Sequence, residues 1–195
     1  MNQIELNGIR KQFEYYKVLG DDTFNQLNDD QLSITMNENC NSIAMIVKHL
    51  HGNLLSRWTD FLFSDGEKEW RNRDEEFEND LNARELLLSK WEEGWNCLFN
   101  AIDSLKVSDL DKTVFIRNQG HSVFEAFLRS LNHIAYHVGQ IVFIGKILQN
   151  DNWKTLSIPK GKSKEYNQTK FHQPKHFEHF SDESILKSKK SQKDN

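Results

Sequence analysis

Hydrophobic residues recur at three- and four-residue steps in four segments of the chain, at residues 4–27, 43–62, 82–105 and 121–148. This spacing places them on one face of an α-helix, so the pattern predicts four long helices. The fourth segment is apolar nearly all round, which is typical of a helix at the centre of its domain. Both prolines of the chain, Pro159 and Pro174, lie after these segments. We therefore expect an all-α fold, a four-helix bundle.

Two long connections and a polar C-terminal region complete this pattern. Residues 67–77 form a charged loop, and a loop of that length is uncommon in a compact domain unless it has a purpose. The connector at residues 107–120 contains a β-prone run at 113–117, which predicts a short strand or an extended loop. After Asn150 the chain is polar and rich in lysine. We expect one helical bundle domain at residues 1–168 and a flexible, disordered tail at 169–195.

The net charge and the cysteine spacing limit the classes of protein to which the chain can belong. The net charge is −4 and the isoelectric point is near 6.1, so we expect no nucleic-acid partner. Cys40 and Cys97 lie far apart without a CxxC spacing, which is typical of semi-buried thiols in a reducing compartment. The first residues lack the apolar core of a signal peptide, and no run of about 18 apolar residues occurs. These features predict a cytoplasmic protein without a membrane span.

Two histidines stand four residues apart in the most apolar of the predicted helices. His133 and His137 share one helix face, about 5–6 Å apart at Cβ, which is close enough to bind one metal ion. Burying unpaired imidazoles would cost solvation energy, and this favours a ligand role. A stable site needs a third ligand, and the second predicted helix offers His49 and His51. These two flank the apolar centre of that helix on opposite sides, so helical phase leaves both open.

A further group of histidines lies in the polar tail. His172, His176 and His179 have a spacing that would suit a metal on a helix. Pro174 lies within this group, and the region is expected to be disordered. We therefore expect solvated histidines there rather than a metal site.

The residues around the central histidines resemble a known family. Residues 133–141 (HIAYHVGQI) resemble the last-helix HxxxH(x)GQI signature of the DinB-like superfamily of metal-binding four-helix bundles. Residues 41–50 (NSIAMIVKHL) resemble its second helix, which carries the first metal ligand. Residues 52–62, 65–68, 70–74 and 153–161 look like one branch of it, known only as a domain of unknown function. The resemblance covers roughly residues 1–168.

The resemblance implies a fold, a ligand set and an assembly. The helices are expected in up-down-down-up order, and His49 is expected to join His133 and His137 as the metal ligands. Zinc or nickel is the usual metal of the superfamily, and homodimers are frequent. Characterised relatives include thiol-dependent transferases and isomerases that use mycothiol, bacillithiol or glutathione. For the branch itself no activity is implied.

Three histidine ligands leave coordination positions open, which is a property of catalytic rather than structural metal sites. An ion of this kind lowers the pKa of a bound water, or binds and deprotonates a thiol. Near it, Arg57, Arg71 and Arg73 are candidates to bind a carboxylate or a phosphate. Trp58 and Trp70 are candidates for an apolar wall of the same pocket.

Each of these pocket residues also has a purely structural interpretation. The arginines can instead form ion pairs that fix the loop. The acidic residues available for this are Asp60, Asp74, Glu75 and Glu76. Asn53, one turn beyond His49, is a candidate to orient a metal-bound water, although capping or solvation fits as well. Gln140 lies three residues past His137 and is a candidate to hydrogen-bond that ligand.

The leading functional hypothesis is a divalent-metal-binding enzyme, either a transferase that uses a low-molecular-weight thiol or a hydrolase. The alternative is a non-enzymatic dimeric protein in which the metal stabilises the fold or senses a ligand. Both hypotheses take zinc or nickel as the cofactor and leave the small-molecule substrate open. A DNA-associated role, which the superfamily's name suggests, is disfavoured by the acidic charge.

Overall fold

The computed structural model describes residues 3–191, and this part of the chain is mostly helical with one small antiparallel sheet. The helices are α1 (Gln3–Phe24), α2 (Asp29–Leu32), α3 (Ile43–Trp58), α4 (Arg84–Asp103), α5 (Val123–Gln149), α6 (Ser163–Phe171) and α7 (Asp182–Ser191). The strands are β1 (Thr113–Ile116) and β2 (Gln119–Ser122). Short 3₁₀ helices lie at Glu75–Phe77, Val107–Asp109 and Asn150–Asn152.

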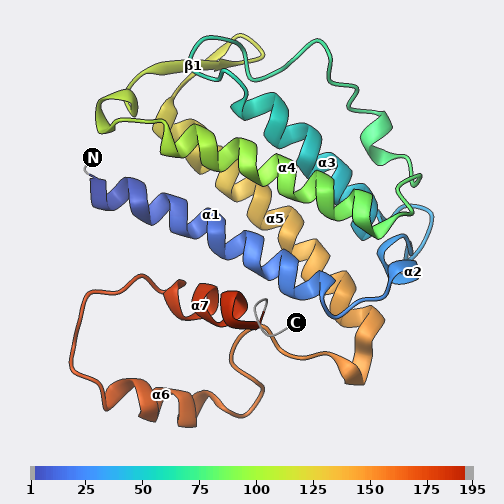
Figure 1. Ribbon diagram of the computed structural model, residues 1–195, viewed down its shortest axis with the longest axis vertical. Helices are drawn as coiled ribbons and strands as arrows, with labels where there is room; N and C mark the ends of the chain where they lie inside the picture. Colours follow the sequence, from blue (N-terminus) through green and yellow to red (C-terminus); the bar gives the residue numbers. More distant parts are fainter. Residues whose placement is uncertain (1–2, 192–195) are drawn as a thin grey trace.

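The long helices α1, α3, α4 and α5 lie side by side and enclose the core (Figure 1). Helices α1 and α5 run away from the end that carries the β-hairpin, and α3 and α4 run toward it (Figure 1). The closest pairs are α3 with α4 and α1 with α5, while α3 also contacts α5. The largest side chains below 2% exposure are Phe13, Phe24, Trp91, Trp95 and Phe127. Their burial removes the most apolar surface from water and fixes how these helices pack.

Hydrogen bonds from side chains define where α3 and α5 begin. Ser42 precedes α3, and its hydroxyl oxygen accepts a hydrogen bond from the Met45 backbone N–H at 3.2 Å. Ser122 does the same before α5 for the Glu125 N–H, and the Glu125 carboxylate accepts the Ser122 N–H in return. These caps satisfy donors that a helix start leaves unpaired. They fix the first turn of the two helices that carry all the histidines of the predicted site.

The predicted boundaries differ from the structure after the second predicted helix and in the connector. The apolar pattern continues to Leu62, but α3 ends at Trp58, because Asp60 takes a positive φ of 49° that no α-helix accommodates. The β-prone run forms β1, which pairs with β2 in a register of Thr113 opposite Ser122. The fold is therefore mostly helical, with a small sheet that the prediction of an all-α protein leaves out.

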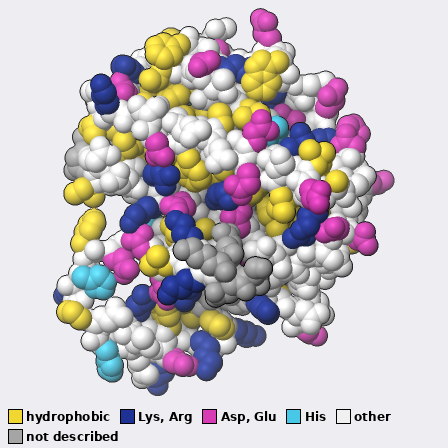
Figure 2. Space-filling model, in the orientation of Figure 1, with side chains coloured by type: hydrophobic (Ala, Val, Ile, Leu, Met, Phe, Trp, Pro, Cys, Tyr) yellow, Lys and Arg dark blue, Asp and Glu magenta, His cyan; other side chains and the backbone are white. Residues whose placement is uncertain are grey.

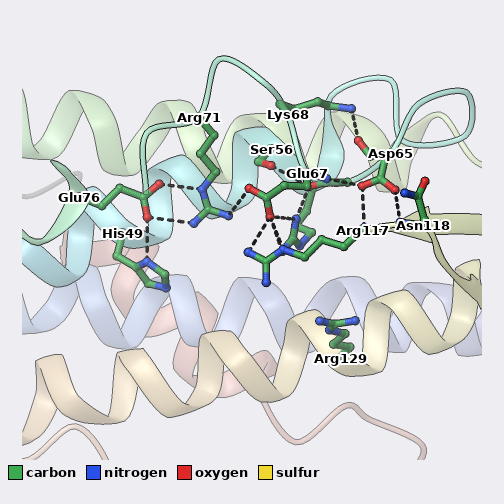
Figure 3. A network of polar contacts seen from close by, with 12 residues as sticks. His49, Ser56, Asp65, Glu67, Lys68, Arg71, Glu76, Arg117, Asn118 and Arg129 are labelled. Carbon is green, nitrogen blue, oxygen red and sulfur yellow. Dashed lines mark hydrogen bonds and ion pairs between the residues drawn. The ribbon is translucent and has the colours of Figure 1, made fainter. Parts of the chain in front are cut away.

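The loop after α3 holds this hairpin in place (Figure 3). The hairpin turn consists of Arg117 and Asn118, with φ values of 55° and 61°, which cost conformational energy for residues other than glycine. The Asp65 carboxylate accepts hydrogen bonds from both of their backbone N–H groups at 2.8 Å. The Gly66 N–H donates to the Phe115 carbonyl at 2.8 Å. The loop and the hairpin therefore form one unit at this end of the molecule.

Replacing Asp65 with alanine is expected to destabilise the protein by about 1–2 kcal/mol, because backbone donors of the hairpin turn lose a charged acceptor. Urea denaturation of the two proteins measures this difference. Asp111→Ala is the matched control, since Asp111 is exposed and should change stability by less than about 0.5 kcal/mol. Equal midpoints for Asp65→Ala and the control would contradict the role of Asp65 as the anchor of the hairpin.

The C-terminal region contains more structure than the polar sequence predicts. We expected disorder from Thr169 onward, whereas Asp182–Ser191 forms α7, which lies along α1 (Figure 1). Ile185 is buried against this contact, and ion pairs flank it at 2.7 Å, from Lys11 to Asp182 and from Lys189 to Glu14. Lys189, one of the lysines that suggested a solvated tail, thus has an acidic partner on α1, which a local composition rule does not consider.

The predictions about membrane spans, cysteines and surface charge can be compared directly with the structure. Within residues 3–191, no helix is long and apolar enough to cross a membrane. Both cysteines are free and half-buried, as their spacing predicts. On the face shown in Figure 2, basic and acidic side chains are interspersed rather than gathered into one stripe.

Candidate functional site

Three histidines from α3 and α5 converge in the core of the molecule. One nitrogen each from His49, His133 and His137 lies within 4.8 Å of the others. The Nε2 atoms of His49 and His133 are 3.1 Å apart, and His49 and His137 are 4% and 9% exposed. Donor atoms this close, on two packed helices, form a cluster that could hold a metal ion.

The structure separates His49 from His51, which helical phase could not do. His49 points toward α5 and the other two histidines. His51 points toward α4, where its Nε2 lies 2.8 Å from the Glu93 carboxylate. The cluster therefore contains the histidine that the family resemblance indicated.

A buried carboxylate from the loop orients His49 (Figure 3). The Glu76 Oε2 atom lies 2.9 Å from Nδ1 of His49. Arg71, with its side chain 2% exposed, donates two hydrogen bonds to the same carboxylate at 2.7 and 2.9 Å. Burial raises the pKa of Glu76, but the hydrogen bonds from His49 and Arg71 outweigh it, so the pKa lies below its usual value. An ionised Glu76 places the His49 proton on Nδ1 and leaves the Nε2 lone pair facing the cluster.

The other two imidazoles differ in how they are supported. The Gln140 amide oxygen lies 3.0 Å from Nδ1 of His137 and can accept its proton, so the Nε2 lone pair of His137 is free. This is the contact for which Gln140 was a candidate. Nδ1 of His133 is buried and, among the described residues, has no hydrogen-bond partner. Two oriented imidazoles and a third with an unpaired nitrogen suit a divalent transition metal.

His133 and His137 are held in the neutral form that metal ligation requires. Burial lowers the pKa of His133 to about 3, and repulsion from the neighbouring imidazoles, Arg57 and Arg71 adds to the shift. Burial and the neighbouring imidazole lower the pKa of His137 to about 4, partly opposed by the hydrogen bond to Gln140. At neutral pH these two imidazoles are therefore uncharged and can offer a lone pair to a metal ion.

These pKa shifts predict that the metal-free protein loses stability as the pH falls from about 6.5 toward 4. In that range the unfolded chain gains protons on His133 and His137, while the folded chain does not. At pH 5.5 the loss is up to about 1.4 kcal/mol for each imidazole. Urea denaturation in EDTA at pH 7.5 and 5.5 measures it. A His133→Gln, His137→Gln variant should lose less stability over the same interval, and an unchanged loss would contradict the assignment.

Glycine at position 52 makes room for the Glu76 carboxylate. A Cβ atom at Gly52 would overlap Oε1 of Glu76 and lie 2.8 Å from its Cδ. Gly52→Ala therefore moves the carboxylate away from His49, and we expect the metal affinity to fall about 10- to 100-fold. Competition with a zinc-binding dye measures this effect. Gly139→Ala on α5 is the matched control, because its Cβ meets open space, and it should leave the affinity unchanged.

A cavity of about 420 Å³ opens beside the histidines and extends to the hairpin. Five of the predicted pocket residues line it, namely Asn53, Arg57, Trp58, Arg71 and Arg73. Trp70, a candidate for its apolar wall, is 59% exposed and lies outside the lining. Phe61 and the hairpin residues Val114 and Ile116 provide apolar surface instead.

The arginines around the cavity divide into two groups. Arg57 and Arg71 pair with Glu67, at 3.4 and 3.9 Å, and Arg71 also holds Glu76. They fix the loop, which is the structural alternative considered above, although Glu67 was not among the acids named for it. Arg73 lies over the Phe77 ring at 5.2 Å and, among the described residues, forms no ion pair. Of the three candidate anion-binding arginines, Arg73 alone is therefore free of a carboxylate.

Sequence reasoning missed several residues that line the cavity. Arg117 comes from the hairpin turn, and Arg129, Ser130 and Tyr136 come from α5. Arg129 was detectable, because it lies four residues before His133 and so shares its helix face. Arg117 was not, because its position depends on contacts between segments far apart in the chain. The pKa of Arg57 is lowered by burial and then by repulsion from Arg71 and Arg129, while Glu67 opposes this, which indicates how closely positive charge gathers here.

The fold and the site define a mostly helical protein with a histidine cluster that could hold a metal ion. The sequence model of the family described as "Protein of unknown function (DUF1572)" matches residues 2–162. The chain belongs to this family. No curated protein and no solved structure matches the chain.

Proposed function

We propose that this protein is a divalent-metal-binding member of the DinB-like superfamily, a four-helix bundle in up-down-down-up order. The observation that carries the proposal is the convergence of His49, His133 and His137 from α3 and α5. The directions of the long helices and the sequence resemblance support the superfamily assignment. Zinc and nickel are the proposed metals, because both bind neutral imidazole well.

We further propose that the site serves a metal-dependent transferase for a low-molecular-weight thiol. A metal ion held by the three histidines would supply Lewis acidity, which would lower the pKa of a bound thiol so that it loses its proton to solvent at neutral pH. Glu76 and Gln140 keep His49 and His137 in the tautomers that bind metal. The apolar cavity wall at Trp58 and Phe61 excludes water from the reacting groups. The histidine side of the cavity is thus suited to present a thiolate to an electrophile bound beside it.

Glutathione, bacillithiol and mycothiol, each supplied with an electrophile such as monochlorobimane, test this proposal on zinc- or nickel-loaded protein. Conjugation above the uncatalysed rate is expected with at least one thiol, and it should be lost in His137→Ala. Thiol binding should also change the absorption spectrum of nickel-loaded protein. If no thiol is turned over and none changes the spectrum, the transferase proposal fails while metal binding stands.

The second candidate is a non-enzymatic dimeric protein in which the metal stabilises the fold or senses a ligand. It is favoured by a row of exposed apolar side chains along α5, an element that also carries two of the histidines. The row consists of Leu128, Tyr136, Phe143 and Ile147, which are 42–65% exposed. Sedimentation analysis should then show a dimer that Phe143→Glu disrupts, and EDTA should lower the melting temperature without any thiol turnover being found.

A further inference from the structure

The charges around the cavity do not balance. Among the described residues that line it, five are arginines and none is acidic. These arginines are Arg57, Arg71, Arg73, Arg117 and Arg129. Glu67 and Glu76 lie behind the lining, and these two carboxylates serve three of the arginines. The cavity therefore carries surplus positive charge within a protein whose net charge is −4, and a bound divalent metal would increase this surplus.

Arg129 is the arginine in the best position to bind a ligand. It projects from α5 toward the group formed by Glu67 and Arg117, without an ion pair to Glu67 (Figure 3). Its guanidinium Nη1 instead donates a hydrogen bond to Nε2 of the His121 ring at 3.0 Å. By contrast, the Arg57 guanidinium is held by the Gly66 carbonyl and by Glu67. A ligand can therefore engage Arg129 without breaking an ion pair.

Within residues 3–191, several buried polar atoms beside the cavity lack a hydrogen-bond partner. Among the described residues, four buried side-chain polar atoms lack a hydrogen-bond partner. Three of them belong to residues that line this cavity, namely Trp58 Nε1, Ser130 Oγ and His133 Nδ1. Buried polar groups without partners are rare in folded proteins, and three of them beside one cavity mark a place where the protein's own hydrogen bonding is incomplete.

We propose that the cavity binds a small organic anion whose acidic group, a carboxylate or a phosphate, lies against Arg129. Arg129, His133 and His137 succeed one another at four-residue steps on α5, so the acidic group lies about one helical turn from the histidine cluster. A guanidinium binds carboxylate and phosphate oxygens by two parallel hydrogen bonds. The middle of the ligand packs on Trp58 and Val114. The inference rests on the proposed function in one respect, namely that another group of the same ligand binds the metal. Binding of the acidic group to Arg129 needs no metal.

Calorimetric titration of EDTA-treated, full-length protein tests this, with succinate, inorganic phosphate and uncharged succinamide as probes at constant ionic strength. Succinate or phosphate is expected to bind and succinamide is not. The tighter of the two anions identifies which acidic group the site prefers. Arg129→Gln should weaken anion binding at least tenfold, and Arg129→Lys should weaken it less, because lysine keeps the charge without the planar fork.

Lys146→Gln is the matched control, because it removes one positive charge from the exposed face of α5 outside the cavity. It should leave anion binding unchanged, and circular dichroism should show that all variants are folded. The proposal is overturned if neither anion binds, or if Arg129→Gln binds anions as tightly as the parent. Arg129-dependent binding in a protein without thiol turnover would separate the two proposals, since the anion site would stand and the transferase would not.

Discussion

The His137→Ala variant is expected to purify with almost no bound metal, whereas the parent protein should carry about one divalent ion per chain. Removing His137 leaves His49 and His133, and two imidazoles do not hold a divalent ion stably. Elemental analysis of untagged protein measures the metal content and also distinguishes zinc from nickel. The effect should exceed that of Gly52→Ala, because it removes a ligand rather than displacing a group that orients one.

The tail histidines require care in this measurement. Deleting the tail would remove α7, which packs on α1. His172, His176 and His179 are therefore better replaced together by glutamine in every protein compared. His51→Ala is the matched control, since His51 lies on the same helix as His49 but pairs with Glu93 on α4. Full metal occupancy in a variant with all three cluster histidines replaced by alanine would refute the site.

Local sequence pattern predicts those parts of the site that depend on one helix alone. His133 and His137 follow from their spacing, because a four-residue step places two side chains on one face of any α-helix. The third histidine did not follow in this way. Helix α3 packs on both α4 and α5, so it has two buried flanks, with His49 on one and His51 on the other. Hydrophobicity marks both flanks as buried but does not say which neighbour each one faces.

The parts of the site supplied by the loop and the hairpin could not be predicted, because contacts between distant segments hold them. The loop after α3 is fixed by hydrogen bonds that join its Asp65 and Gly66 to the hairpin, and by the ion pair between Arg71 and Glu76. None of these contacts leaves a periodic pattern in the sequence. The same reason explains α7, where Lys189 pairs with Glu14 of α1 at a sequence separation of 175 residues. The predictions were therefore least complete for the charged, irregular segments.

Glu76→Ala is expected to destabilise the metal-free protein by about 3 kcal/mol, the largest loss of stability among the variants considered. The substitution removes the carboxylate that Arg71 holds by two hydrogen bonds and leaves a guanidinium that is 2% exposed. Removing one partner of a buried ion pair costs about 3–5 kcal/mol. The lower end is expected, because Glu67 lies 3.9 Å from Arg71 and can partly replace the lost partner. Urea denaturation in EDTA measures the change.

A second pairing of a histidine with a carboxylate in the same protein provides the control. Glu93 lies 2.8 Å from His51, but its side chain is 61% exposed, so Glu93→Ala should cost less than about 1 kcal/mol. Glu76→Gln separates the two roles of Glu76, because the amide keeps one acceptor for His49 but loses the charge that neutralises Arg71. If Glu76→Ala and Glu93→Ala cost the same, the carboxylate does not support the cluster. A large difference would mean that the metal site and the stability of the loop depend on one buried group.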